Sequence, residues 1–168
     1  MNWEDVMQLH NTAAQELLST AERVPAQKWL VPRAEGKWSP AEVVEHLNLA
    51  YDVFMRELGG EPGMQIRTKL WQRVLLKVTM VPRILAGRGF PVGARAPRET
   101  RPALTSTDQG AAIAAFRDRA GRFEVAAAEA QSGRPRTRLT HAYFGRMSLR
   151  DSVLICARHI QHHQKQLG

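Results

Sequence analysis

The sequence predicts an all-α fold, a bundle of four or five helices with at least one long connection. Three observations favour this fold class. Apolar residues recur three and four positions apart over several segments, which is the spacing of one face of an α-helix. Several of these segments begin with helix-capping residues and end near glycine. No segment shows the strict apolar and polar alternation that indicates a half-buried strand.

The first predicted helix covers residues 3–23 and ends at Val24-Pro25. Its apolar positions lie near helical spacing: Val6, Leu9, Ala13, Leu17 and Ala21. Residues 25–36 are expected to be irregular, because two more turn-forming residues, Pro32 and Gly36, interrupt any period.

The second predicted helix covers residues 40–58. Ser39-Pro40 is a strong helix start, since the serine hydroxyl caps free amides and proline suits the first helical position. Gly59-Gly60 ends the helix. The expected buried stripe is Val43, Leu47, Ala50 or Tyr51, Phe54 and Leu58. His46 lies beside this stripe and is therefore expected to face inward.

Residues 65–86 are predicted to form a third helix, which Pro82 kinks or ends. Its apolar positions are read as the core face of a bundle helix: Ile66, Leu70, Val74, Val78, Val81 and Leu85. An alternative is a basic surface like that of an interfacial helix, made by Arg67, Lys69, Trp71, Arg73 and Lys77. Residues 87–107 are expected to form a long surface crossover and not a domain boundary.

Two further helices complete the prediction. Thr107-Asp108 caps a helix that runs towards Gln131, and Ser132-Gly133 ends it. Residues 134–147 are expected to be irregular, without strands. A capping-box-like sequence at residues 148–151 then begins the last helix, which covers about residues 149–167.

Length and composition indicate one domain over residues 1–168. The N-terminus does not resemble a secretory signal, and no apolar run approaches the roughly 18 residues of a membrane span, so a cytoplasmic protein with no membrane partner is expected. The lone Cys156 can form no internal disulfide.

Residues 1–60 hold 5 Lys+Arg against 9 Asp+Glu, and residues 61–168 hold 19 against 7. Because arginine is spread along the second segment and no nucleic-acid motif occurs, we expect no nucleic-acid partner.

Histidines supply the strongest chemical signal. His159 and His163 are one helical turn apart, so their imidazoles can converge on one divalent metal ion. His46 on its inward-facing position is the natural third ligand, and three histidines leave a position open, as in catalytic metal sites. A solvated, histidine-rich C-terminus is the alternative. His162 competes with His163 for the ligand role, and Cys156 lies on the same face as the pair.

The sequence resembles the DinB/YfiT-like metal-binding helical bundles in three places. These are WSPAEVVEHL at residues 38–47, FGRMS at residues 144–148 and the pattern His159-x3-His163-x2-Gln166. The resemblance covers essentially the whole chain. It implies a four-helix bundle with a long crossover, often dimeric, with a metal site at His46, His159 and His163. It also implies a metal-dependent transferase that uses a low-molecular-weight thiol, of the bacillithiol or mycothiol type, on an electrophile.

We therefore expect a divalent metal ion, zinc or nickel, and a homodimer. Non-catalytic metal binding and metal-dependent hydrolysis are the alternative functions. No catalytic acid or base is assigned. Gln166 and Glu45 are candidates for orienting the ligands, and Trp38 is expected to pack as an apolar plug more often than to stack on a substrate. His10 and His141 are expected to be loop or surface histidines.

Overall fold

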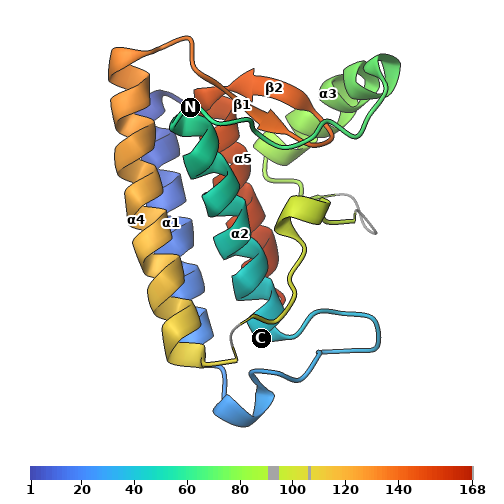
Figure 1. The fold of residues 1–168 in the computed structure, drawn as a ribbon, viewed down its shortest axis with the longest axis vertical. Helices are drawn as coiled ribbons and strands as arrows, with labels where there is room; N and C mark the ends of the chain where they lie inside the picture. The colour runs from blue at the N-terminus through green and yellow to red at the C-terminus, as the bar shows by residue number, and fades with distance from the viewer. Residues whose placement is uncertain (91–94, 106, 168) are drawn as a thin grey trace.

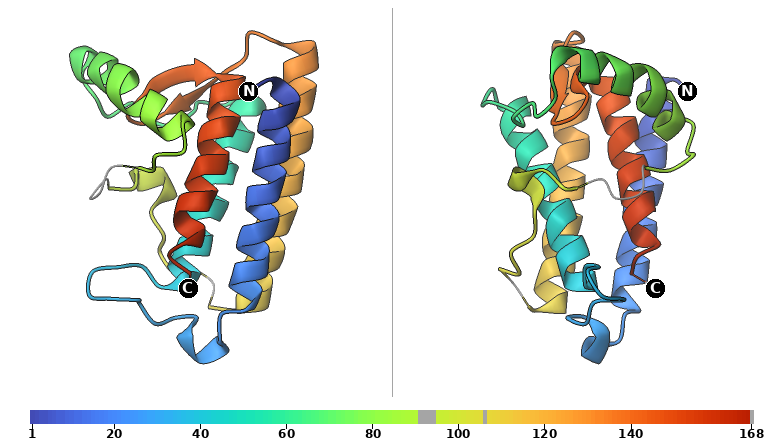
Figure 2. Two further views of the ribbon diagram at one scale, coloured as in Figure 1. Left: turned by 180° about the vertical axis from the view of Figure 1, so that it is seen from behind. Right: turned by 90° about the vertical axis from the view of Figure 1, so that its right-hand side faces the viewer.

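The computed structural model describes residues 1–90, 95–105 and 107–167, and over these it holds five α-helices and one two-stranded sheet. The helices are α1 (Trp3–Glu22), α2 (Pro40–Leu58), α3 (Leu70–Leu85), α4 (Gln109–Gly133) and α5 (Leu149–Gln164). Two short 3-10 helices, η1 (Ala26–Lys28) and η2 (Arg98–Thr100), lie in the connections. Helices α1, α2, α4 and α5 run alongside one another, while α3 and the sheet lie to one side (Figures 1 and 2).

Local capping sets where the packed helices begin. Ser39 Oγ accepts a hydrogen bond from the Glu42 amide, and the Glu42 carboxylate accepts one from the Ser39 amide at 2.7 Å, which makes a capping box at the start of α2. Ser148 Oγ accepts from the Asp151 amide at 3.1 Å at the start of α5. The predicted start of each helix is confirmed because its signal is local in the sequence.

The main core lies between these four helices. Helix α1 packs against α5 and α4, and α2 packs against α4. The predicted stripe of α2 is buried, and Tyr51 from this stripe packs on Phe116 and Phe123 of α4 with ring centroids 5.5 and 5.4 Å apart. The apolar faces that the spacing predicted for α1, α2 and α4 therefore meet in one interior.

A β-hairpin occupies the segment expected to be irregular, so that prediction was wrong. Strand β1 (Arg138–His141) pairs antiparallel with β2 (Gly145–Ser148). Strands of four residues are too short to show a recognisable alternation in the sequence. Glu57 from the end of α2 holds β1, since its carboxylate accepts from the Thr140 amide at 2.8 Å and from the Thr140 hydroxyl at 2.7 Å.

Helix α3 buries only the C-terminal end of the predicted apolar stripe. It begins at Leu70, five residues later than expected, and ends at Leu85, three residues beyond Pro82. Its buried residues Val81 and Ile84 pack with Phe144, Met147 and Ile155 in a second, smaller core. Much of the stripe read as a core face is exposed instead: Leu70 70%, Val74 55% and Val78 69%. Periodicity alone cannot tell which part of an apolar stripe is covered.

The described part of the expected crossover contains η2 and otherwise irregular chain, and residues 91–94 and 106 of that prediction lie outside the described residues. Helix α5 ends at Gln164, three residues before the predicted end. None of the helices in the described part of the chain is long and apolar enough to cross a bilayer.

Candidate metal centre

Helices α2 and α5 bring the three predicted histidines together. His46 comes from the second turn of α2, and His159 and His163 come from the last two turns of α5. Exposure is 3% for His46 and 6% for His163, and His159 is partly buried. Two segments separated by more than a hundred residues thus meet at one side-chain cluster.

The Nε2 atoms of the three rings converge. His46 Nε2 lies 3.1 Å from His159 Nε2, and His163 Nε2 lies 2.9 Å from the same atom. All three ligand atoms lie within 4.8 Å of one another. A tetrahedral zinc ion with bonds of about 2.0–2.1 Å separates its nitrogen ligands by roughly 3.3 Å. Small shifts of the rings would therefore admit an ion.

Hydrogen bonds on the far side of two rings fix which nitrogen faces the cluster. His46 Nδ1–H donates to the Thr100 carbonyl at 2.6 Å, and His163 Nδ1–H donates to Gln166 Oε1 at 2.9 Å. Each bond places the proton on Nδ1 and leaves the Nε2 lone pair pointing at the other rings. This is the outer support that metal-binding histidines ordinarily have.

Burial keeps these imidazoles neutral. It lowers the pKa of His46 to about 4 and that of His163 to about 3, and it lowers the pKa of His159 well below its usual value. The Nε2 lone pairs of His46 and His163 both face His159 Nε2, which can donate only one proton. A divalent cation would satisfy all three nitrogens at once, so the residues present fit a metal ion.

Aromatic rings cover the cluster on two sides. Trp38 lies 4.8 Å from the His46 ring and 5.9 Å, nearly parallel, from the His163 ring. Phe90 lies 5.4 Å from both His159 and His162. Trp38 thus packs on the candidate ligands themselves, and together with Phe90 it shields the cluster from water.

The two competitors for the ligand role lie outside the cluster. His162 Nε2 accepts a hydrogen bond from the Gln166 side-chain amide at 3.1 Å, so Gln166 holds His162 and His163 by its two ends. Cys156 is buried, which raises the pKa of its thiol to about 12 and keeps it protonated. Within the described residues, neither side chain belongs to the group that could hold the ion.

Glu45 binds the crossover chain beside the candidate metal centre. Its carboxylate accepts from the amides of Leu104 at 2.7 Å and Thr105 at 3.1 Å, and from the Thr105 hydroxyl at 2.7 Å. These bonds hold the crossover that carries Thr100, whose carbonyl in turn orients His46. Glu45 therefore supports the site through the backbone and contacts no candidate ligand.

Two histidines were expected at the surface or in loops, but His10 is buried in a helix and His141 is partly buried on a strand, so those predictions were wrong. His10 is 0% exposed, where its Nδ1–H donates to Glu124 at 2.8 Å and its Nε2 accepts from the Tyr51 hydroxyl at 2.8 Å. His141 lies on β1, where its ring stacks on Phe144 at 4.3 Å and burial lowers its pKa to about 4. The signal for His10 was available, because it falls on the same helical stripe as Val6 and Ala13.

Comparison with known families finds one that spans the chain. The family model described as the DinB superfamily matches residues 8–167. Neither the curated proteins nor the solved structures contain a match to this chain.

Proposed function

This chain belongs to the DinB superfamily, and we propose that it is a metal-dependent enzyme in which His46, His159 and His163 bind one divalent ion, zinc or nickel. The convergence of three neutral Nε2 atoms carries this proposal. Among the described residues no fourth protein ligand joins them. Three protein ligands with one open position are typical of catalytic metal sites and not of closed structural ones.

The reaction we propose is the transfer of a low-molecular-weight thiol, of the bacillithiol or mycothiol type, to an electrophilic substrate. When bound, the ion would lower the pKa of a thiol or water in its open position. Thr100 and Gln166 hold two of the ligand rings in place, and Trp38 and Phe90 keep water from two sides of the site. Support for a thiol as the nucleophile comes from the motif resemblance.

Two other functions would use the same three histidines. A metal-dependent hydrolase would place water in the open position, and a non-catalytic metal protein would close that position. The partial exposure of His159 and the separation of Cys156 and His162 from the cluster favour an open site. We further infer that α1, α2, α4 and α5 form the four-helix bundle with a crossover that the motifs imply, as a homodimer.

The test has two stages. Elemental analysis of untagged protein, purified without added metal, should find one zinc or nickel ion per chain. Loss of free thiol is then followed with a panel of low-molecular-weight thiols and electrophiles, for the metal-loaded protein and for His46→Ala, with His162→Ala as the control. Thiol loss that depends on His46 and survives in His162→Ala would support the proposal. Equal rates in wild type and His46→Ala would contradict it.

A further inference from the structure

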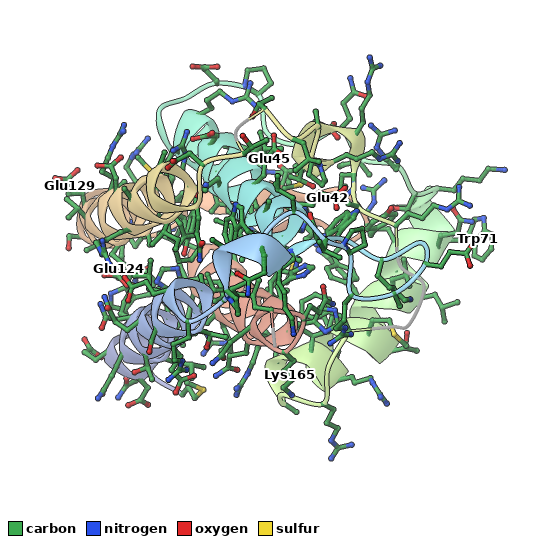
Figure 3. All side chains as sticks on the ribbon, turned by 90° about the horizontal axis from the view of Figure 1, so that it is seen from below. Glu42, Glu45, Trp71, Glu124, Glu129 and Lys165 are labelled. Carbon is green, nitrogen blue, oxygen red and sulfur yellow. The ribbon has the colours of Figure 1, made fainter. Side chains whose placement is uncertain are left out.

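The outer face of α3 is apolar and exposed. Its five exposed side chains are Leu70 at 70%, Trp71 at 65%, Val74 at 55%, Leu75 at 55% and Val78 at 69%. At about 100° per residue they occupy one arc of roughly 140°, and no polar residue of α3 falls within it. Trp71 lies at the outer edge of the molecule and points away from the packed helices (Figure 3).

The C-terminal turns of α3 pack inside the protein, whereas the exposed part of the apolar arc lies towards its N-terminus. Val81 and Ile84 already pack on the hairpin and α5, and Lys77 Nζ donates to the Arg146 carbonyl at 2.8 Å. Contiguous exposed apolar patches of more than a few hundred Å² are rare on proteins without a partner at that surface. The exposed apolar face of α3 therefore points to a partner at this surface.

Charge indicates what that partner is. Residues 62–98 contain eight Lys+Arg and no Asp or Glu. Exposed basic residues lie at both ends of α3, with Lys69 at its start, Arg83 in its last turn and Arg88 just beyond. A second copy of this face would bring like charges together, which disfavours a homodimer through α3. An apolar surface bordered by negative charge satisfies both features.

We propose that α3 lies in the headgroup region of an anionic lipid bilayer, with its outer face inserted and Lys69, Arg83 and Arg88 at the lipid phosphates. Amphipathic helices with tryptophan and leucine on one face and basic residues beside it bind such surfaces without spanning them. Long basic side chains extend to the phosphates while their stems stay apolar. Phe90, which shields the candidate metal centre, follows α3 by five residues, so the docking helix and the centre are neighbours in the chain.

Vesicle co-sedimentation of the full, metal-loaded protein tests this proposal. We expect binding to equimolar phosphatidylcholine and phosphatidylglycerol vesicles, little binding to phosphatidylcholine alone, and a blue shift of tryptophan emission that Trp71→Phe removes. The double variant Val74→Glu/Val78→Glu should lose binding at least tenfold. Val125→Glu, at a 60% exposed valine on α4, is the matched control and should bind as wild type does.

The charged part has its own variant. Lys69→Gln/Arg83→Gln/Arg88→Gln should weaken binding to the anionic vesicles by about a hundredfold, because each basic residue near such a surface contributes about 1 kcal/mol. Thermal melting checks that every variant folds. The proposal would be overturned if the wild type did not bind anionic vesicles, or if Val125→Glu lost as much binding as Val74→Glu/Val78→Glu. It would also be overturned if the wild type formed a homodimer that Val78→Glu dissociates and did not bind vesicles. Binding that survives Val74→Glu/Val78→Glu would also overturn it.

Discussion

Each imidazole of the candidate metal centre is neutral at neutral pH, because burial lowers the pKa of His46 to about 4, that of His163 to about 3 and that of His159 well below its usual value. Neutral imidazole is the form that coordinates a metal ion. At pH 7 no proton therefore has to be removed from these rings before a metal ion binds.

We expect His46→Ala and His159→Ala each to abolish stoichiometric metal binding, because two remaining imidazoles make a weak site. The fold should persist, since the metal-free cluster contributes no covalent or ionic link. His162→Ala should keep one ion per chain, because His162 lies outside the cluster. Elemental analysis and zinc titration measure all three. If His162→Ala loses metal as fully as His46→Ala does, the ligand assignment is wrong.

Gln166 gives a second residue-level prediction. It accepts the Nδ1–H bond of His163, so Gln166→Leu should weaken zinc binding by about 10–100-fold while keeping one ion per chain at saturation. Gln164→Leu is the matched control, since Gln164 lies on the same turn and its amide donates to Thr20 at 3.3 Å. Competition with a zinc chelator measures both affinities. Equal affinities in the two variants would contradict a supporting role for Gln166.

Helical spacing and motif resemblance placed His46, His159 and His163 correctly as neighbours, whereas His10 and His141, which lack partners at useful spacing, were expected in loops or at the surface. His10 is one turn after Val6 and lies on the buried stripe of α1, so the argument used for His46 applied to it as well. No local pattern could have placed His141, because its burial comes from a hairpin that packs on α5. The contacts that surround His141 come from residues far away in the sequence. The hydrogen bond from His46 to the Thr100 carbonyl is a long-range contact of the same kind.

At the scale of the helix, capping decides how α2 presents its ligand. Ser39 is 1% exposed and makes three hydrogen bonds with Glu42. The Glu42 carboxylate accepts from the Ser39 amide and, at 2.9 Å, from the Ser39 hydroxyl, and the Glu42 amide donates to Ser39 Oγ. Because His46 lies seven residues after this cap, the start of α2 sets the height at which His46 meets α5. The cap thus contributes both to stability and to the position of the candidate ligand.

Ser39→Ala should lower the free energy of unfolding of the metal-free protein by about 1 kcal/mol and by no more than about 2 kcal/mol. The physical reason is the loss of the hydroxyl that satisfies a free amide of the first turn. Ser132→Ala, at an exposed serine near the end of α4, should change it by less than about 0.5 kcal/mol. Urea titration at constant m-value compares the two. A larger loss in Ser132→Ala would rule out this account of the cap.

Four helices were predictable because their signals are local, whereas the hairpin and the buried part of α3 were not. Ser39, Asp108 and Ser148 cap α2, α4 and α5 within three residues of each start. The hairpin depends on Glu57 reaching across from α2. Which part of α3 is buried depends on Phe144, Met147 and Ile155, which belong to the hairpin and α5. Contacts of this kind leave no periodic trace in the sequence.

Over the whole molecule, the candidate metal centre is assembled by segments that are far apart in the sequence. His46 comes from residues 40–58, its supporting carbonyl from η2, and the other two rings from α5. Unfolding separates them and exposes every ring to water, where the imidazole pKa returns to its ordinary value of about 6.5. Stability and the protonation of the site are therefore linked.

The metal-free protein should lose stability as pH falls from about 6.5 towards 4. In that window the unfolded imidazoles take up protons, while folded His46 and His141 stay neutral down to about pH 4 and His163 down to about pH 3. His159, whose pKa is also well below its usual value, adds a fourth such group, so the unfolded state binds up to four more protons than the folded state. The free energy of unfolding should fall by as much as about 5 kcal/mol per pH unit at the steepest point. Urea titrations across this range, with His141→Gln giving a shallower slope, measure the effect.

Zinc binds the neutral form of each imidazole, and burial keeps His46 neutral in the folded, metal-free protein down to about pH 4 and His163 down to about pH 3. Zinc should therefore raise the melting temperature by a similar amount at about pH 7.5 and at about pH 5, with less than one proton taken up for each ion released. In His163→Ala the zinc-dependent rise should nearly vanish at both pH values. Thermal melting with and without saturating zinc measures this directly. A zinc-dependent rise that is unchanged in His163→Ala would mean that zinc stabilises the protein through some group other than the three histidines.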